Sequence, residues 1–394
     1  MPRSTQSERI IIALLMMFLL CSAFSIALAQ IGYFSALTIW VIRMVLRKQK
    51  EFARTDVDIF FLLYAVAEFI SFLVSYNQSQ SLLYLQRRLL LLPIVHVLVS
   101  NIDSERTLRW MFGAMILSAL GVALWSCRDL VLHFPAYLRF ERRLSEFQIY
   151  MTAGGIMMIA VLMVLPFVVH RSTPTRIRWG AAVLLFPLMV NLLFTFTRSS
   201  WLGFLAGAIV IAARRNWRIL IPLVVVVVLV IGLSAPDMQE RMISTFDLHH
   251  PNNSSRVQMW HVGLQMFLDH PIFGIGDMGT EQLWDRYGEP GWVPEGHLHS
   301  NVLMWMATLG SVGTIVLIGL FVRIWITLSA IEKWLRAEWF LGSLSLGGLA
   351  GLVGFHVNGL FEWNFGDAEI IMLIWAIAGL GFAADRVKSR ELVQ

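Results

Sequence analysis

Long apolar runs separated by short polar stretches dominate the chain, and this pattern predicts membrane-spanning helices. A helix needs about 20 mostly apolar residues to cross a bilayer. The sequence contains such runs at residues 10–26, 28–46, 57–75, 82–100, 107–127, 149–170, 178–196, 199–213, 217–234, 301–327, 337–360 and 366–385. The predicted fold is therefore an all-α polytopic membrane protein with about 12 transmembrane helices, forming one integral membrane domain over residues 1–394.

The longest polar interruption is a loop at residues 235–300, between the ninth and tenth predicted spans. Residues 252–255 read Asn-Asn-Ser-Ser and supply helix-capping side chains, and Pro271 ends the segment that follows. Apolar residues recur between these limits at helical spacing: Val257, Trp260, Leu264, Phe267 and Leu268. The pattern predicts an amphipathic helix whose apolar stripe lies on the membrane surface or against the bundle. A second short helix is expected over residues 278–287.

Two details of this loop bear on ligand binding. Arg256 falls in the first turn of the expected helix, where free N–H groups and the helix dipole favour an anion. The segment 271–276 is a glycine-rich turn that is too short to be a nucleotide-binding loop.

The composition agrees with a membrane protein and excludes a soluble domain. Hydrophobic residues make up 57% of the chain and charged residues 14%, against roughly 25% charged residues in a soluble domain. The formal net charge is +5, but the basic residues lie in short clusters between apolar runs, so nucleic-acid binding is not expected. Cys21 and Cys127 lie in apolar segments and predict neither a disulfide nor a thiolate metal site. Residues 27–29 resemble a signal-peptidase site, but the apolar run continues through Leu46 and favours a retained helix.

The distribution of positive charge predicts the topology. With a cytoplasmic N-terminus, 21 of the 31 Lys and Arg residues lie on the inside and ten on the outside. The loop 235–300 then faces outward, and both termini face the cytoplasm. All ten outer residues are arginine: Arg87, Arg88, Arg128, Arg139, Arg142, Arg143, Arg198, Arg241, Arg256 and Arg286. Guanidinium binds phosphate bidentately, so as a set these residues indicate an anionic ligand on the outer face. Headgroup contacts and salt bridges are the alternative for any single one.

Histidine is concentrated in the same loop, which holds six of the ten histidines of the chain. They are His249, His250, His261, His270, His297 and His299. A zinc site is the alternative reading, because imidazole is a common zinc ligand. The sequence has no His-Glu-x-x-His helix and no Asp-x-Asp pair, so no metal site is predicted.

The end of the loop carries a spaced pattern: His299-Ser300, nine residues, Gly310, three residues, Thr314. It resembles the signature of the O-antigen ligases, within the wider family of membrane ligases and polymerases of lipid-linked polysaccharides. The resemblance extends to residues 197–201 (Thr-Arg-Ser-Ser-Trp) and to Arg256 with Trp260 before the turn at 271–276. The acceptor-side loop is matched only loosely, by residues 142–147.

This resemblance implies a metal-independent glycosyltransferase of the membrane-embedded C type. The donor would be an O-antigen polysaccharide on undecaprenyl diphosphate, and the acceptor a sugar hydroxyl of the lipid A-core oligosaccharide in lipopolysaccharide biosynthesis. A single displacement at the sugar C1 would invert its configuration. The resemblance also implies the inner (cytoplasmic) membrane of a Gram-negative cell, an active site that faces the periplasm, and no cofactor.

Site residues are assigned on the same basis. His299 is the expected catalytic base, and His297 a less essential neighbour. Fixed cations must stabilise the leaving diphosphate where no metal does so. Arg198 and Arg256 are the first candidates for this role, followed by Arg88, Arg142 and Arg143. Glu362 and Asp367, which follow the eleventh span, are candidates to orient His299 or the arginines, with a solvated turn as the alternative. Glu68, in the third span, is either paired inside the bundle or functional.

Three other functions remain open. An O-antigen polymerase or a protein O-oligosaccharyltransferase would keep the enzyme class and change the acceptor. A transporter or flippase of the lipid-linked sugar would belong to a different class. It would require an inverted repeat and paired broken helices, and neither is visible in the sequence.

Overall fold

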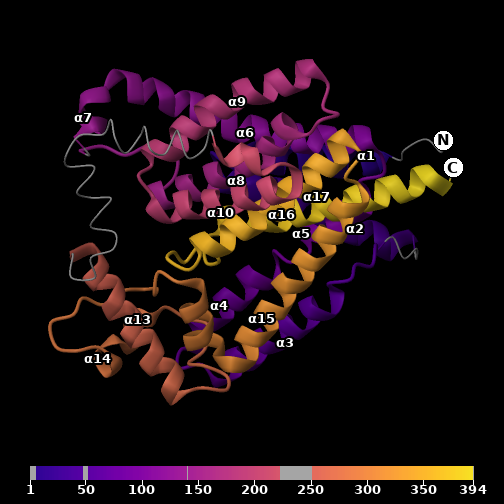
Figure 1. Ribbon diagram of the computed structural model, residues 1–394. Helices are drawn as coiled ribbons and strands as arrows, with labels where there is room; N and C mark the ends of the chain where they lie inside the picture. The colour runs from indigo at the N-terminus through magenta and orange to yellow at the C-terminus, as the bar shows by residue number, and fades with distance from the viewer. Residues whose placement is uncertain (1–5, 48–51, 140, 222–250, 394) are drawn as a thin grey trace.

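The computed structural model describes residues 6–47, 52–139, 141–221 and 251–393, and this part of the chain is helical without any strand (Figure 1). The α-helices are α1 Gln6–Cys21, α2 Ile26–Arg47, α3 Asp58–Val74, α4 Gln78–Leu89, α5 Ile94–Asn101, α6 Glu105–Leu132, α7 Phe134–Leu138, α8 Tyr150–Val169, α9 Thr175–Phe194, α10 Arg198–Arg215, α13 Pro251–Asp269, α14 Trp284–Tyr287, α15 Asn301–Trp334, α16 Trp339–Asn358 and α17 Ala368–Val393. Two short 3-10 helices are η1 Trp217–Ile219 and η3 Thr280–Leu283.

Helices α8, α16 and α17 form the centre of the bundle. Their most apolar stretches are 83%, 83% and 89% buried, whereas the corresponding stretch of α9 is 22% buried. Helix α9 exposes Trp179, Val183 and Phe186, each by more than two thirds. Exposed apolar surface of this extent is typical of a lipid-facing helix.

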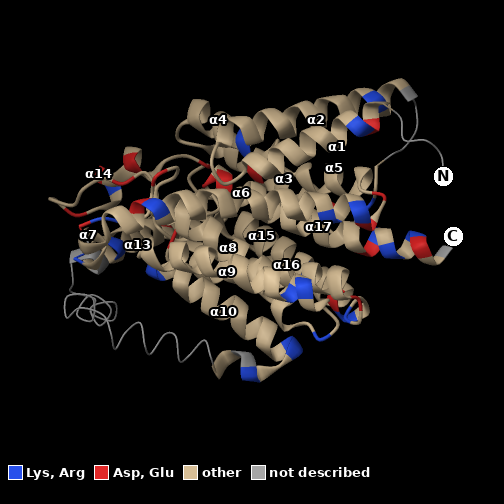
Figure 2. Cartoon of the chain, turned by 90° about the horizontal axis from the view of Figure 1, so that it is seen from above, with Lys and Arg blue, Asp and Glu red and all other residues tan. Residues whose placement is uncertain are grey.

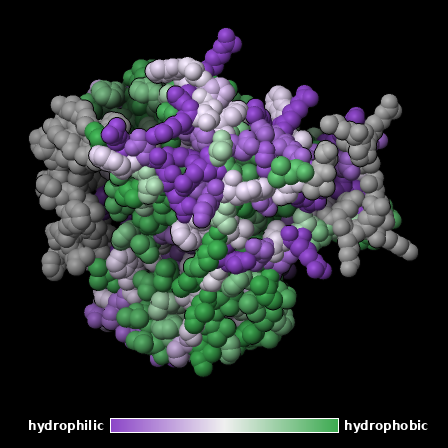
Figure 3. Space-filling view, turned by 45° about the vertical axis from the view of Figure 1, so that its right-hand side comes forward, coloured by the Kyte–Doolittle hydropathy of each residue, from purple (hydrophilic) through white to green (hydrophobic). Residues whose placement is uncertain are grey.

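Charged and apolar residues are separated along the molecule. Figure 2 shows most of the charged residues near the two ends of the long helices, with a largely uncharged middle. On the face seen in Figure 3, hydrophilic side chains gather in the upper part and hydrophobic ones cover the lower part. Together with the apolar helices, this distribution identifies a multi-pass membrane protein.

The described part of the chain supports some of the twelve predicted spans and does not test all of them. Eight helical segments of the described chain are long and apolar enough to cross a membrane. Helices α1, α3 and α10 are not among these eight, although they overlap predicted spans. Residues 222–250 lie outside the described part, and they include most of the ninth predicted span and the first part of the loop. Twelve spans therefore remain a prediction.

The fourth predicted span, residues 82–100, is not one continuous helix. Helix α4 ends at Leu89, and α5 begins after Pro93, which cannot donate a backbone hydrogen bond and so favours an interruption. The stretch Gln78–Asn101 is nevertheless long and apolar enough to cross a membrane, as the sequence predicts.

The tenth predicted span is also interrupted. Gly310 in α15 has φ 64° and ψ −166°, which are not helical angles, so residues 301–309 and 311–334 form two helical segments. The indole of Trp305 in the first segment stacks on Phe321 in the second, with ring centroids 6.0 Å apart. A straight helix would separate these residues by about 24 Å, so the two segments fold toward each other. The described chain therefore contains two interrupted helical stretches, neither of which is visible in the sequence.

The segment 271–276 fits into the break in α15. Ile275 and Gly276 donate backbone hydrogen bonds to the carbonyls of Ala307 and Thr308, at 2.9 and 3.1 Å. In the other direction, the amide of Ser311 donates to the carbonyl of Pro271 at 2.8 Å. These bonds use backbone groups that the interruption of the helix leaves without intrahelical partners. The glycine-rich turn predicted from the sequence therefore packs against the break at Gly310, which is the hinge of α15.

We expect Gly310→Ala to destabilise the folded protein severely. A Cβ at this position would lie 2.4 Å from backbone atoms of Ile272, and a φ of 64° is unfavourable for alanine. A backbone cannot move aside as a flexible side chain can, so a loss of several kcal/mol is expected, on the order of 3. Thermal unfolding in detergent measures it. Gly291→Ala is the control for positive φ, because it has φ 92° but no atom within 4 Å of an added Cβ. Equal melting temperatures of the Gly310→Ala variant and the wild type would contradict the hinge.

Helix α13 confirms the predicted loop helix but differs from it in two details. It begins at Pro251, so the expected N-cap at 252–255 is wrong, and Arg256 lies in the second turn rather than the first. The helix buries Met259, Val262 and Met266, whereas much of the predicted apolar stripe is exposed. The predicted second short helix is present as η3 followed by α14.

We expect reporter fusions or cysteine labelling to place Asp285 outside and Arg215 inside the membrane. Asp285 lies in α14. Arg215, at the end of α10, is paired with Glu332 in the last turn of α15, with an N–O distance of 3.3 Å. The division of basic residues predicts which end faces the cytoplasm. Labelling of both positions from the same side would contradict this topology.

Candidate active site

His299 lies at the start of α15 in a strained backbone conformation. Its φ is 46°, in the left-handed region that residues other than glycine rarely occupy. The next residue, Ser300, caps the helix by accepting a hydrogen bond from the amide of Leu303 at 3.5 Å. Backbone strain of this kind is found at functional sites more often than elsewhere.

Glu362, in the turn between α16 and α17, joins His299 to Arg256. Its Oε2 lies 2.9 Å from Nδ1 of His299, and its Oε1 lies 2.6 Å from a guanidinium nitrogen of Arg256. The hydroxyl of Ser199 donates to the same Oε1 at 3.4 Å. All four side chains are buried or mostly buried. Glu362 therefore connects three elements that are distant in the sequence, α10, α13 and the start of α15.

The charge of Glu362 follows from these contacts. Burial alone raises the pKa of a carboxyl group, but the hydrogen bond from His299 and the positive charge of Arg256 hold the pKa of Glu362 below its ordinary value. Glu362 is therefore ionised and can only accept hydrogen bonds. It follows that Nδ1 of His299 carries the proton in this contact, and Nε2 of a neutral His299 is left as the basic nitrogen.

His297 lies beside His299, with ring centroids 4.3 Å apart in an edge-to-face arrangement. Burial lowers the pKa of the His297 imidazole to about 4, and the nearby charge of His299 contributes in the same direction. His297 is therefore neutral at neutral pH. Its Nδ1 is buried and has no hydrogen-bond partner in the described chain.

A buried amide network holds the site together. Asn301, directly after the cap of α15, donates to Asn364 at 2.5 Å, and Asn364 donates to Asn358 at 3.3 Å. Asn358 in turn donates to the hydroxyl of Ser200 in α10 at 2.8 Å. Satisfied polar networks in a low-dielectric interior fix the relative positions of the elements they join. Of these asparagines, sequence reasoning singled out only Asn364, as a residue that could orient His299 or the arginines; it missed Asn301 and Asn358, although amides at the ends of apolar spans are a signal for such a network.

The imidazoles of His297 and His299 open into a cavity of about 360 Å³. Its lining includes Glu362 and, from the start of α8 and the segment before it, Gln148, Ile149, Met151 and Thr152. Asp367 also lines the cavity, and its carboxylate accepts a hydrogen bond from the hydroxyl of Thr152. The cavity is therefore bordered by acceptor groups and by a basic imidazole, a combination suited to binding hydroxyl groups.

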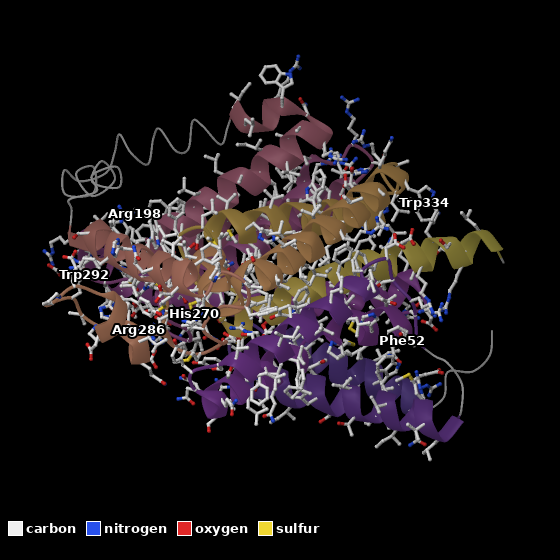
Figure 4. All side chains as sticks on the ribbon, turned by 90° about the horizontal axis from the view of Figure 1, so that it is seen from below. Phe52, Arg198, His270, Arg286, Trp292 and Trp334 are labelled. Carbon is white, nitrogen blue, oxygen red and sulfur yellow. The ribbon has the colours of Figure 1, made fainter. Side chains whose placement is uncertain are left out.

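Arg198 is the first residue of α10 and directly precedes Ser199. The chain turns into this helix through Phe196, whose φ of 51° is the second strained value at a residue other than glycine. The hydroxyl of Thr197 donates to the carbonyl of Tyr150 at 3.0 Å and ties the turn to α8. Figure 4 shows Arg198 at the same end of the molecule as His270, Arg286 and Trp292.

Arg88 is placed differently from the other arginine candidates. Its guanidinium bonds both carboxylate oxygens of Asp277, lies 3.5 Å from Glu68, and rests over the rings of Trp363 and Phe365 at 5.2 and 5.1 Å. Glu68 also accepts a hydrogen bond from the hydroxyl of Tyr64. This confirms the paired alternative for Glu68. Arg88 lines a separate cavity of about 380 Å³, which meets the first one at the turn 366–368.

Arg142 and Arg143 lie in the segment before α8 and do not line the cavity beside His299. Arg142 pairs with Asp129 of α6 at 2.8 Å. The guanidinium of Arg143 lies 4.3 Å from the centre of the Tyr150 ring. The same segment continues into Gln148 and Ile149, which do line that cavity. The structure therefore brings together His299, His297, Glu362 and Arg256, and leaves Arg88, Arg142 and Arg143 outside this cluster.

Comparison with known protein families places part of the chain. Residues 180–318 match the family described as O-antigen ligase. The matched region runs from α9 into the second segment of α15 and contains Arg198, Arg256 and His299. It supports a function of the ligase or polymerase type that acts on lipid-linked polysaccharide. No curated protein matches the chain significantly.

Proposed function

We propose that this chain, whose residues 180–318 match the O-antigen ligase family, transfers O-antigen polysaccharide from undecaprenyl diphosphate to a sugar hydroxyl of the lipid A-core oligosaccharide. The observation that carries the proposal is the contact between His299 and Glu362 at 2.9 Å, at the start of the His-Ser-x9-Gly signature. We further propose that the protein resides in the inner membrane and that this site faces the periplasm.

The arrangement supports general-base catalysis by His299. Glu362 accepts the proton of Nδ1 in a hydrogen bond, so Nε2 is free to take the proton of the acceptor hydroxyl. The acceptor oxygen forms a bond to C1 of the donor sugar while the bond from C1 to the diphosphate oxygen breaks. The electron pair of the broken bond leaves with undecaprenyl diphosphate, and C1 is inverted. A positioned base of this kind contributes about a hundredfold to ten-thousandfold to the rate.

Arg256 and Arg198 are proposed to stabilise the leaving diphosphate. Arg256 uses one nitrogen for Glu362, and guanidinium has five N–H donors, so donors remain for an anionic ligand. Arg198 lies beside Ser199, which contacts the same glutamate. Preorganised donors of this kind often provide the largest catalytic contribution. We propose that they do so here without a metal ion.

The second group of arginines receives different roles. Arg88 holds the 277 region against the turn at 363–365, so we propose that it positions this turn rather than binding the diphosphate directly. Arg142 and Arg143 lie on the segment that leads to the cavity wall, where they remain candidates for contacts with the anionic core of the acceptor.

We expect Arg256→Lys and Arg198→Lys each to lower the transfer rate by roughly tenfold or more. Lysine keeps the charge but loses the planar fork of donors that binds a phosphate bidentately, and at position 256 this fork also contacts Glu362. The measurement is the initial rate of transfer at equal protein level. Arg286→Lys is the matched control, because Arg286 also pairs with a carboxylate of the loop, Asp269, at 3.3 Å but lies on the exposed surface. Normal rates in both of the first two variants would reduce these arginines to topology signals or lipid contacts.

A gel of lipopolysaccharide from cells with and without the protein tests the ligase against its alternatives. Loss of long-chain lipopolysaccharide, with accumulation of polymer on undecaprenyl diphosphate, is the result expected for the ligase. Cores capped with only a single repeat would indicate a polymerase instead. If the protein were a transporter, its loss would leave the lipid-linked substrate on the cytoplasmic side. The broken helices α4–α5 and α15 give this last alternative its only structural support in the described chain.

A further inference from the structure

A larger cavity lies at the end of the long helices opposite His299. Its volume is about 800 Å³, against about 360 Å³ for the cavity beside His299. It is bordered by the segment before α3 and by the last turns of α15 and α17. Trp334, which lines it, is labelled in Figure 4 at the end of the molecule opposite Arg198.

Guanidinium groups line part of this cavity. Arg54 is exposed and forms no ion pair with any residue of the described chain. Arg386 is partly buried and donates from one nitrogen to the carbonyl of Val99 at 2.9 Å, which leaves its remaining donors available. Arg323 is occupied by Asp56, with an N–O distance of 3.0 Å. Two guanidinium groups are therefore available for a phosphate group.

An acidic group lies beside them. Asp385 precedes Arg386 on α17, lines the cavity, and has neither an ion pair nor a hydrogen bond within the described residues. A carboxylate that is partly buried without a partner favours a cationic ligand. The cavity thus offers positive and negative groups side by side, which is unsuited to a simple anion.

The remaining wall is apolar and faces outward. Ile326 and Trp334 of α15 are 45% and 46% exposed, and Phe382 of α17 also lines the cavity. Tryptophan is enriched where a membrane protein meets the headgroup region of the bilayer. The wall can therefore accept a hydrocarbon chain next to the charged groups.

We propose that this cavity binds a zwitterionic phospholipid of the ethanolamine type. The phosphate lies on Arg54 and Arg386, the ammonium group on Asp385, and an acyl chain along Ile326 and Trp334. Each part of the ligand has a counterpart among the lining groups, and the cavity exceeds the roughly 300 Å³ that a small ligand needs. The inference does not rest on the proposed function, because it concerns the other end of the molecule.

Lipid binding to the purified full-length protein tests this proposal. Native mass spectrometry of delipidated protein, titrated separately with phosphatidylethanolamine, phosphatidylcholine and phosphatidylglycerol, compares the three headgroups. Phosphatidylethanolamine is expected to bind about tenfold more tightly than phosphatidylcholine, because a trimethylammonium group cannot donate a hydrogen bond to Asp385. Phosphatidylglycerol has no cation and is expected to bind more weakly as well. Free phosphoethanolamine is expected to compete only weakly, because it lacks the acyl chain.

Substitutions assign the preference to the cavity. Asp385→Asn is expected to bring phosphatidylethanolamine and phosphatidylcholine to similar affinities, and Arg54→Gln to weaken both. Arg54 is exposed, so its replacement does not threaten folding. Arg390→Gln, on the exposed part of α17 outside the cavity, is the control and is expected to change neither affinity. Equal binding of the two lipids by the wild type would overturn the proposal. So would tightest binding of phosphatidylglycerol, an unchanged preference in Asp385→Asn, or competition by free phosphoethanolamine as strong as that of the lipid.

Discussion

Replacement of His299 by alanine is expected to lower polysaccharide transfer by at least a hundredfold while leaving expression and donor binding nearly unchanged. The imidazole is the only described basic nitrogen that is both in the cavity and oriented by an ionised carboxylate. A proton acceptor acts mainly in the transition state, so its loss affects the rate far more than binding. The measurement is the initial rate of transfer to lipid A-core by purified protein, with donor binding measured separately.

Two other histidines provide the controls. His297→Ala is expected to be milder, because His297 is neutral and its Nδ1 has no partner in the described chain. His261 is exposed on α13, and His261→Ala is expected to have a normal rate. A normal turnover in His299→Ala, or an inactive His297→Ala beside an active His299→Ala, would show that the assignment of the base is wrong.

Glu362→Gln is expected to lower the transfer rate by one to two orders of magnitude, on the order of the loss when the orienting partner of a catalytic group is removed. The amide is close in shape to the carboxylate, but it cannot fix the tautomer of His299 or balance the charge of Arg256. An amide also stabilises a protonated imidazole less than a carboxylate does. The acidic limb of the pH–rate profile should therefore move to lower pH.

This shift separates an effect on the chemistry from an effect on folding. A merely structural role of Glu362 would lower the amount of active protein without moving the pH profile. Glu289→Gln, which changes an exposed acid of the loop 235–300, is the control and is expected to leave both rate and profile unchanged. An unchanged profile in Glu362→Gln would remove Glu362 from the mechanism.

The sequence predicts the helical membrane fold and the region of the site, because both depend on local patterns. Apolar runs give the helices directly. The spacing from Ser300 to Gly310 and Thr314 has a structural explanation: Ser300 caps a short helix, Gly310 ends it, and the hydroxyl of Thr314 bonds the carbonyl of Gly310 at 2.7 Å. The signature therefore encodes a hinge, but composition alone cannot show that its two halves fold toward each other.

What the sequence does not give is the set of long-range partners. Glu362 is separated from His299 by 63 residues and from Arg256 by 106, and no local pattern links them. The asparagine network also depends on long-range contacts, because Asn358 and Ser200 lie in different helices. The pairing of Arg88 with Asp277 likewise depends on the fold of the loop against α4. Charge counting finds such arginines without distinguishing a ligand-binding group from a buried structural pair.

The most direct test of the account is a transfer reaction with purified protein, labelled polysaccharide on undecaprenyl diphosphate, and lipid A-core as acceptor, in excess chelator. The account predicts that label appears on the core while an equal amount of undecaprenyl diphosphate is released, and that Glu362→Gln slows both products together. Longer chains that remain on the diphosphate, with no label on the core, would contradict ligation. Transfer that occurs only after magnesium or manganese is restored would contradict a site that stabilises the leaving group with Arg198 and Arg256 alone.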